Sequence, residues 1–281
     1  MMILVDGQRI DSVPANDRGL AYGDGAFETL RARKRKLPLL EYHLERLFAG
    51  LRVLGIPPVS QEILRRELNE AARENPDGIV KLIVTRGSGA RGYRVPVDCE
   101  PRRIITTAPL SIDLTAWRER GVVLRVCTTP LEGPRALDGL KHLNRLSQVL
   151  ARAEWRDPGI HEGLMRDAAG HIVEGTMSNL FAVCNNALIT PPVGPGVRGV
   201  MRRLVLELAT ANGIETAERF LDDADIEKAD ELFITNSVIG MCPVRQLALG
   251  SASHAFGIGT MTRVLQTEIE NELERRACSD D

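Results

Sequence analysis

Leucines recur with helical spacing between residues 39 and 54, and this pattern constrains the fold of the first hundred residues more than any other. Apolar residues three and four positions apart share one helix face, so we expect an amphipathic helix packed on a core. Gly55 and Pro57-Pro58 follow the pattern and end the helix. The stripe consists of Leu40, Leu44, Leu47, Leu51 and Leu54.

The other segments of this half favour strands and a second helix. Asp6-Gly7 is a strong turn dipeptide and predicts a hairpin between residues 2–5 and 8–13. Ser60 has the chemistry of a helix cap, and an apolar stripe follows it. We expect further strands at 26–33, 79–86 and 102–108, the last two of them paired.

The second half begins a new β pattern after a segment that we interpret as a linker, residues 113–120. We therefore expect an N-terminal domain over 1–112 and a C-terminal domain over 121–281. The mixture favours an α+β fold rather than a regular βαβ alternation. Helices are expected at about 141–156, 199–212, from Asp222 or Asp223, and at 260–276, and strands at 162–166, 171–174, 179–184, 187–190 and 231–235.

Composition excludes several classes of protein. Basic and acidic residues nearly balance over the 281 residues, with a formal net charge of −2, which argues against a nucleic-acid binder. Apolar runs are too short for a membrane span or a signal peptide. The five cysteines form no C-x-x-C pair, so we expect no metal site and a reduced, cytoplasmic compartment.

Lys141 and Glu174 have the chemistry that pyridoxal phosphate requires. A lysine amine condenses with an aldehyde, and a buried carboxylate keeps a ring nitrogen protonated. Lys141 is expected in the first turn of a helix, where the dipole would lower the pKa of its amine. The ordinary alternatives are a solvated lysine and an exposed strand glutamate.

Two segments are candidates for binding an anion. The run Gly196-Val-Arg-Gly199-Val-Met-Arg-Arg203 places glycine backbone at the start of a helix, where free N–H groups attract a phosphate. Arg46, beside the leucine stripe, can grip a phosphate with its guanidinium, or can be a surface arginine. Ser237 after the strand at 231–235 is a further candidate.

The motif Gly87-Ser-Gly-Ala-Arg-Gly92 matches a dinucleotide fingerprint in letters only. Pro96 follows it and prevents the helix that such a site needs. We expect a flexible loop from which Arg91 and Tyr93 can reach a substrate carboxylate.

Taken together, these motifs resemble the fold-type IV pyridoxal phosphate enzymes, which include D-amino-acid and branched-chain aminotransferases and the aminodeoxychorismate lyases. The resemblance spans about residues 2–247. Residues 85–93 and 141–146 are most similar to the lyases. The motifs in order are Gly23-Asp-Gly-Ala-Phe-Glu-Thr29, His43-Leu-Glu-Arg46, Lys141-His-Leu-Asn-Arg-Leu146, Glu174-Gly-Thr-Met-Ser-Asn-Leu-Phe181 and Gly199-Val-Met-Arg202.

The resemblance implies a two-domain fold-type IV enzyme, with a small α/β N-terminal domain, a larger C-terminal pseudo-barrel and a homodimer. It implies that Lys141 bonds the cofactor aldehyde and Glu174 its ring nitrogen. Arg46, Ser237 and the backbone of Val200 and Met201 would hold the phosphate, with Ser178 and Asn179 as further cofactor contacts. Met201 stands where the aminotransferases often have a hydroxyl residue.

The implied reaction is the release of pyruvate and p-aminobenzoate from 4-amino-4-deoxychorismate, a step of folate biosynthesis. Lys141 or Thr29 would protonate the leaving pyruvate. An aminotransferase on the same fold is the nearest alternative, although only Tyr22, Tyr42 and Tyr93 are available for an aromatic-rich branched-chain pocket. A non-catalytic nucleotide-binding module is the alternative from another class.

Overall fold

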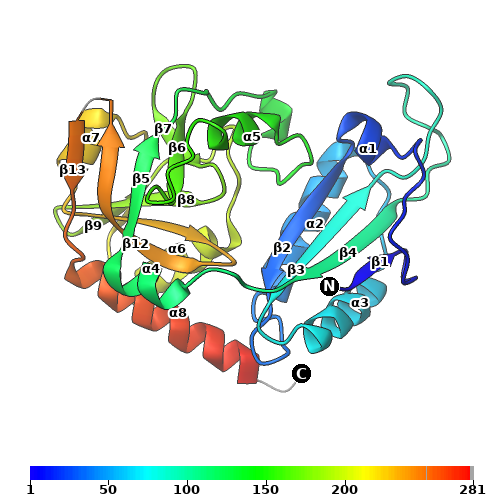
Figure 1. Cartoon of the computed structure of the whole chain (residues 1–281), viewed down its shortest axis with the longest axis horizontal. Coiled ribbons are helices and arrows are strands. Elements are labelled where there is room, and N and C mark those ends of the chain that lie inside the picture. Colours follow the sequence, from blue (N-terminus) through cyan, green and yellow to red (C-terminus); the bar gives the residue numbers. More distant parts are fainter. Residues whose placement is uncertain (251, 279–281) are drawn as a thin grey trace. The chain divides into compact units, whose positions relative to one another are not determined.

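The structure is a computed structural model that describes residues 1–250 and 252–278. The chain forms two compact units, both drawn in Figure 1. The first unit holds Met1–Ser111, Leu140–Asn144 and, of the described residues near the C-terminus, 273–278. The second unit holds Ile112–Gly139 and Arg145–Glu272. The segment around Lys141 therefore belongs to the first unit although the chain around it belongs to the second.

The first unit is built on an antiparallel four-stranded sheet with the order β1-β4-β3-β2. The predicted pairing of the strands near 79–86 and 102–108 is confirmed. The predicted hairpin is wrong, because β1 pairs with β4, Ile3 opposite Thr106, and only Gln8 forms a bridge back to Val5. The strands are β1 (Ile3–Val5), β2 (Gly25–Arg31), β3 (Ile79–Thr85) and β4 (Arg102–Ala108).

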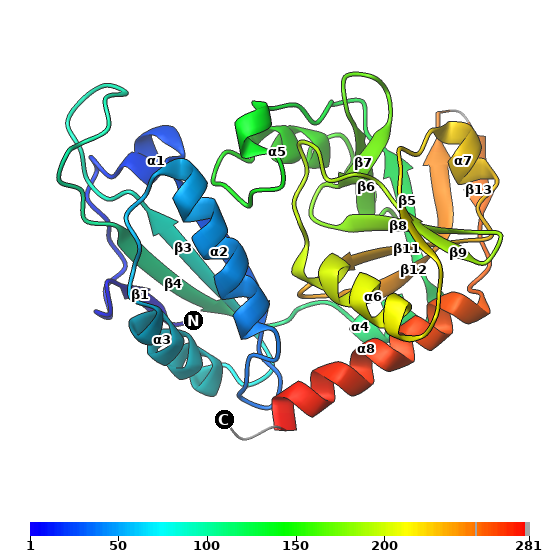
Figure 2. The same ribbon diagram turned by 180° about the vertical axis from the view of Figure 1, so that it is seen from behind.

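Two amphipathic helices, α2 (Leu40–Leu54) and α3 (Gln61–Glu74), cover one face of this sheet (Figure 2). Both were predicted and are confirmed, including the Ser60 hydroxyl that accepts from the N–H of Ile63 at 3.3 Å. Leu44, Leu47 and Leu51 are buried in one core with the inward side chains of the strands. The short helix α1 (Arg18–Tyr22) has too few residues to show a period in the sequence.

The second unit contains a ring of six strands. The pairings run β8-β11-β12-β5-β6-β7, and β7 pairs again with β8, which closes the sheet on itself. The α+β fold class and the pseudo-barrel are thereby confirmed. The closing pair is Glu174 opposite Asn179. The six strands are β5 (Val122–Val126), β6 (Glu162–Arg166), β7 (Ile172–Gly175), β8 (Asn179–Cys184), β11 (Glu231–Asn236) and β12 (Gly240–Leu249).

Further elements surround this ring. Residues 113–120, expected as a linker, contain the helix α4 (Leu114–Arg120). The strands β9 (Ala187–Thr190), β10 (Thr216–Glu218) and β13 (Ala252–Ala255) extend the sheet. The remaining helices are the 3-10 turn η1 (Arg135–Leu137), α5 (Leu146–Arg152), α6 (Val200–Ala211), α7 (Asp223–Glu227) and α8 (Thr260–Cys278). Among the described residues, no helix is both long and apolar enough to cross a membrane.

Candidate active site

Lys141 lies in an extended segment beside the edge strand β2, not in a helix. Its carbonyl accepts from the N–H of Phe27 at 2.9 Å, and the N–H of Leu143 donates to Gly25 at 3.0 Å. The predicted helix from 141 is therefore wrong, since α5 begins only at Leu146. The edge of β2 supplies backbone hydrogen-bond partners for these residues, and a helical conformation would not form those bonds. The proposed helix-dipole effect on the Lys141 amine loses its basis.

The amine of Lys141 is positioned over an aromatic ring. Its Nζ lies 4.5 Å from the centre of the Phe27 ring, a distance typical of a cation–π contact. Thr29 follows two positions later on β2, so its side chain lies on the same sheet face as that of Phe27. Lys141 therefore lies in a segment bonded to β2, and β2 carries the candidate proton donor Thr29.

Glu28 alternates with these residues and points to the opposite, helix-covered face, where it is 1% exposed. One oxygen accepts from Nε of Arg46 at 2.8 Å, and the other from an Nη of Arg46 and from Nδ1 of His43, the latter at 2.6 Å. Arg46 and His43 are one helical turn apart on α2. The carboxylate therefore fixes the orientation of the arginine that was predicted to bind phosphate.

The protonation states in this cluster follow from its neighbours. Burial raises the pKa of Glu28, but the charge and hydrogen bonds of Arg46 and His43 outweigh it and bring the pKa to about 2. Burial lowers the pKa of His43 against the opposing effect of Glu28. Glu28 is therefore ionised at neutral pH and His43 is a neutral donor. Glu28 was not predicted; the signal that could have found it is the alternation of side chains along β2, which places Glu28 inward, since a buried carboxylate requires partners.

Arg91 and Tyr93 lie in the long loop between β3 and β4, and both are exposed. The loop has an ordered base, because the buried guanidinium of Arg18 donates to the carbonyls of Gly92 and Tyr93. The Tyr93 ring lies 5.4 Å from that of Tyr22. No helix follows the glycine motif, as expected. A role for Arg91 and Tyr93 in substrate binding stays a prediction.

Glu174 is buried in the second unit, at the strand pair that closes the ring. Its Oε2 accepts from Nδ2 of Asn179 at 3.1 Å and from the N–H of Val197 at 2.9 Å. Gly196 and Gly199 leave room for these contacts, because a Cβ at Gly199 would overlap the Asn179 amide and one at Gly196 would lie 2.8 Å from the Glu174 carboxylate. The glycines are thus required by close approach, and they fix Glu174 in one orientation.

A second buried carboxylate, Glu162, lies next to this site and was not predicted. It accepts from the hydroxyls of Thr176 and Ser178, at 2.6 and 3.0 Å, and from three backbone N–H groups nearby. Burial raises its pKa, which the hydrogen bonds offset only in part. Ser178, predicted as a cofactor contact, therefore directs its hydroxyl to Glu162. The shared role of these bonds is to hold the turn between β7 and β8.

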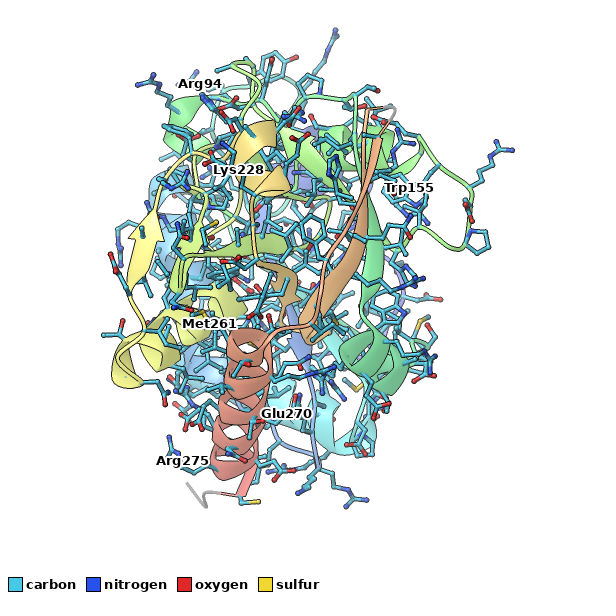
Figure 3. The ribbon with its side chains drawn as sticks, turned by 90° about the vertical axis from the view of Figure 1, so that its left-hand side faces the viewer. Arg94, Trp155, Lys228, Met261, Glu270 and Arg275 are labelled. Atoms are coloured by element: carbon cyan, nitrogen blue, oxygen red, sulfur yellow. The ribbon has the colours of Figure 1, made fainter. Side chains whose placement is uncertain are left out.

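The start of α6 has the properties of an anion site. Its cap residue is Gly199, and no side chain of residues 1–250 or 252–278 caps the helix. The N–H groups of Val200 and Met201 belong to the first turn, which has no acceptors within the helix. By contrast, α8 begins at the carboxylate of Glu231, which accepts from Met261 and Thr262 at 3.2 and 2.8 Å. Figure 3 labels Met261 at the start of α8.

The other cations near α6 serve mainly as structural partners. Arg202 is buried, and its Nη2 lies 2.8 Å from the Glu218 carboxylate and donates to the carbonyl of Pro191. Arg203 pairs with Glu207 at 2.8 Å, one helical turn on. An anion at this helix start would therefore be held chiefly by backbone N–H groups.

Ser237 lies in the half-buried turn between β11 and β12. Asn236 fixes this turn, because its side-chain oxygen accepts from the N–H groups of Val238 and Ile239, both at 2.9 Å. Its amide also donates to the carbonyl of Met177 at 3.1 Å, which ties the turn to the Glu162 segment. The turn that carries Ser237 is thus rigidly linked to the strand pair of Glu174.

The residues present fit the cofactor that the motifs imply. The first unit brings together Lys141, Phe27 and Thr29 on one sheet face and Glu28, His43 and Arg46 on the other. The second unit brings together the Glu174 carboxylate, Asn179 and the uncapped start of α6. The buried Glu174 has the donors that keep a carboxylate oriented, and the open glycine backbone at α6 suits a phosphate.

Comparison with known proteins adds independent information. Residues 25–247 match the family described as "Amino-transferase class IV". An aminodeoxychorismate lyase from Vibrio harveyi is 36% identical over 267 residues, covering 94% of this chain and 98% of the relative. The crystal structure of 4-amino-4-deoxychorismate lyase from Pseudomonas aeruginosa superposes with a TM-score of 0.91 at 45% identity, covering 97% and 100% of the two chains.

Aminotransferases are also similar to this chain. A putative branched-chain-amino-acid aminotransferase from Methanocaldococcus jannaschii is 32% identical over 280 residues, 96% of either chain. The branched-chain enzyme of Escherichia coli superposes with a TM-score of 0.85 at 25% identity, covering 96% of this chain and 93% of that one. The Vibrio and Pseudomonas lyases are therefore more similar to this chain than these two aminotransferases are, while the fold is common to both activities.

Proposed function

We propose that this chain, which belongs to the class-IV aminotransferase family, is a pyridoxal-phosphate-dependent 4-amino-4-deoxychorismate lyase that releases pyruvate and p-aminobenzoate. The observation that carries the proposal is the near full-length similarity to a lyase, at 45% identity with a TM-score of 0.91. The geometry of the two units supplies the groups that this chemistry needs. The reaction would serve folate biosynthesis.

In this proposal, the candidate residues of the preceding subsection hold the cofactor. Lys141 bonds its aldehyde carbon, Glu174 accepts from its ring nitrogen, and Asn179 keeps Glu174 oriented. The phosphate is bound by the N–H groups of Val200 and Met201 at the start of α6. Arg46 and Ser237 are the proposed side-chain ligands of the phosphate. When bound, the cofactor supplies a protonated pyridine ring that accepts electron density from the carbon next to the substrate nitrogen.

The chain's own residues then move protons. Lys141, as a neutral amine, removes the proton from the ring carbon that bears the substrate nitrogen. The bond between the neighbouring carbon and the enolpyruvate oxygen breaks, and the ring becomes aromatic. Lys141 or Thr29 protonates the released enolpyruvate, which gives pyruvate. Glu174 stays ionised opposite the ring nitrogen throughout.

Glu28 contributes indirectly to this site. A guanidinium has five N–H groups in a rigid fork, so bonds to Glu28 do not exhaust the donor capacity of Arg46. The two bonds to Glu28 fix the plane of the fork before a phosphate arrives, which reduces the entropy lost on binding. We therefore assign Glu28 as a positioning residue rather than an acid or base.

We also propose that the protein is a cytoplasmic homodimer. The helix α5 exposes an apolar stripe in which Leu146 is 69%, Val149 60% and Leu150 54% exposed. Such a contiguous stripe on a short helix is typical of a surface that another chain covers. All five cysteines are free thiols, which suits a reducing compartment.

A direct assay tests the activity. Purified protein loaded with pyridoxal phosphate is given 4-amino-4-deoxychorismate, and we expect fluorescent p-aminobenzoate and pyruvate in equal amounts. Glu174→Gln should retain the cofactor and lose at least about 10²-fold in kcat, because an amide cannot hold the ring nitrogen protonated. Lys228→Ala, an exposed lysine of the second unit, is the matched neutral control.

The family's aminotransferase activity is the second candidate, favoured by the 32% identity to the Methanocaldococcus relative. An aminotransferase requires a keto acid to complete its cycle. Turnover of a D- or branched-chain amino acid with a keto acid, without p-aminobenzoate formation from aminodeoxychorismate, would replace the lyase proposal with this one.

A further inference from the structure

A basic groove lies on the first unit, and Lys141, Phe27 and Thr29 are not among the residues that line it. It encloses about 1000 Å³ and is bounded by four elements: the turn after β2, the start of α2, helix α3 and the end of α8. Its cations are Lys34, Arg35, Lys36, Arg65, Arg73, Arg275 and Arg276, and its other lining residues are Leu37, Pro38, Leu40, Glu41 and Asn69. We call this set the basic groove; Figure 3 labels Arg275 near the end of α8.

The charge of the groove contrasts with that of the whole chain. Seven of its lining residues are cations and one is a carboxylate, whereas the chain as a whole has a formal net charge of −2. The carboxylate, Glu41, forms an ion pair with Arg65. Like charges that converge from separate elements repel one another. An anion seated between them would relieve this repulsion.

The turn at the rim holds its cations in an unfavourable backbone conformation. Lys34 and Arg35 have φ angles of 50° and 68°, in the left-handed region that disfavours residues with a Cβ. The backbone bonds between Arg33 and Lys36, both at 2.9 Å, close a two-residue hairpin. Asn-Gly is the sequence that such a turn normally prefers. The preference of the turn does not explain two long cationic side chains at these positions. Their presence therefore indicates that the positive charge has a function.

The cations on the helices lie at separated positions. Arg65 and Arg73 are eight residues apart on α3, which places them on the same face two turns apart. Arg276 is fixed by Tyr42, whose hydroxyl lies 3.0 Å from Nη2 and whose ring centre lies 4.7 Å from the guanidinium carbon. The positive charges therefore form an elongated array rather than a single point.

We propose that the basic groove binds a linear oligophosphate anion. Planar guanidinium forks match the oxygens of phosphate in pairs, and an elongated array suits several phosphates in a chain. None of the described residues that line the groove is aromatic, so they offer no stacking surface for a nucleobase. The occupant is accordingly an inorganic or aliphatic oligophosphate rather than a nucleotide. This site is independent of the lyase activity proposed above.

Calorimetric titration of the cofactor-loaded protein with sodium tripolyphosphate tests the proposal, because the loaded cofactor occupies its own phosphate site. We expect one binding site per chain, weakened by added salt. Orthophosphate should bind at least about tenfold more weakly, since it contacts fewer cations. Tetraglutamate and ATP are the comparison anions.

The decisive variant is Lys34→Asn/Arg35→Gly, which removes two cations and gives the turn its preferred residues. It should melt at or above the temperature of the wild type and bind tripolyphosphate at least about tenfold more weakly. Arg73→Gln, on α3, should weaken binding in the same direction without touching the turn. The control Arg156→Gln/Lys228→Gln removes two exposed cations of the second unit and should bind like the wild type.

Four results would overturn the proposal. Wild-type affinity in both groove variants would show that the groove is not the site, as would an equal loss in the control. Tighter binding of tetraglutamate than of tripolyphosphate would show that the ligand class is wrong. Binding of ATP tenfold tighter than tripolyphosphate would show that a base is recognised. Lyase activity is measured on the same samples, so failure of one proposal leaves the other intact.

Discussion

Glu28 in the first unit and Glu162 in the second are both buried carboxylates, 1% and 2% exposed. Their surroundings nevertheless shift their pKa values in opposite directions. Arg46 and His43 surround Glu28, and its pKa falls to about 2. Among the described residues, the hydrogen-bond donors to Glu162 are neutral hydroxyl and backbone groups, and burial raises its pKa. The contrast teaches that a charged partner, rather than the number of hydrogen bonds, decides whether a buried acid stays ionised.

The largest effect should come from removing the charged partner. Arg46→Ala leaves the Glu28 carboxylate buried without its guanidinium, which should cost roughly 3–5 kcal/mol of unfolding free energy. Denaturant unfolding measures it. The double variant Glu28→Gln/Arg46→Met removes both charges and should recover a large part of the loss. Equal destabilisation in the single and double variants would contradict an uncompensated charge as the cause.

Lowering the pH should change the contributions of Glu28 and Glu162 to stability in opposite directions. The pKa of Glu28 is lowered on folding, so its contribution, on the order of 3 kcal/mol, is present above its usual pKa of 4.5 and is lost as pH falls toward about 2. The pKa of Glu162 is raised, so its contribution is present below 4.5 and is lost as pH rises through the folded pKa. Glu28→Gln should flatten the acid side of the stability curve.

The same curve measured on Glu162→Gln provides the matched control. Its acid side should stay as steep as in the wild type, while the loss of stability with rising pH becomes smaller. A Glu28→Gln curve that keeps the wild-type acid slope would place the acid sensitivity elsewhere in the chain.

Disrupting the hydrogen bonds that Glu162 accepts should lower the unfolding free energy less than Arg46→Ala does at the same pH. Glu162→Gln keeps the shape and one acceptor oxygen but sets an amide against the donors from Met177 and Ser178. We expect a loss of about 1–2 kcal/mol at pH 7, less than for Arg46→Ala. Thermal unfolding at pH 7 compares the two variants directly. A larger loss than that of Arg46→Ala would reverse the order that the comparison predicts.

The third buried carboxylate, Glu174, should be sensitive to changes in the position of its partner Asn179. Gly199→Ala places a Cβ on the Asn179 amide, which must then leave Glu174 or shift it. We expect about a tenfold weaker affinity for pyridoxal phosphate, or about 1.4 kcal/mol, measured by cofactor titration. Gly133→Ala is the control, since its Cβ would meet no atom within 4 Å. Unchanged affinity in Gly199→Ala would separate Asn179 from cofactor binding.

Much of the fold followed from local pattern. Helices α2 and α3 have apolar stripes with end signals, and β3 and β4 are β-branched runs, so their residues alone predict them. The failures come from tertiary partners. The strand β1 pairs with β4, about a hundred residues away, rather than across the Asp6-Gly7 turn. Strand β12 contains Pro243, which argues against a central strand, and Arg245 and Gln246 interrupt its apolar residues, so its sequence did not predict it.

The sequence motifs supply the candidate residues of the site, but they do not supply the surroundings of those residues. Lys141 reads as a helix start because Leu143 and Leu146 suggest helical spacing, and only the free edge of β2 explains its extended backbone. The pairing of Glu28 with His43 and Arg46 needs the packing of α2 on β2. The role of Gly199 depends on how closely it approaches Asn179.

Borohydride reduction of the cofactor-loaded protein, followed by peptide mass spectrometry, tests the central claim most directly. The account predicts that the cofactor becomes attached to Lys141, and that Lys141→Ala takes up no label. Attachment to Lys34, Lys36, Lys81 or Lys228 instead, or a Lys141→Ala variant that keeps its activity, would contradict it.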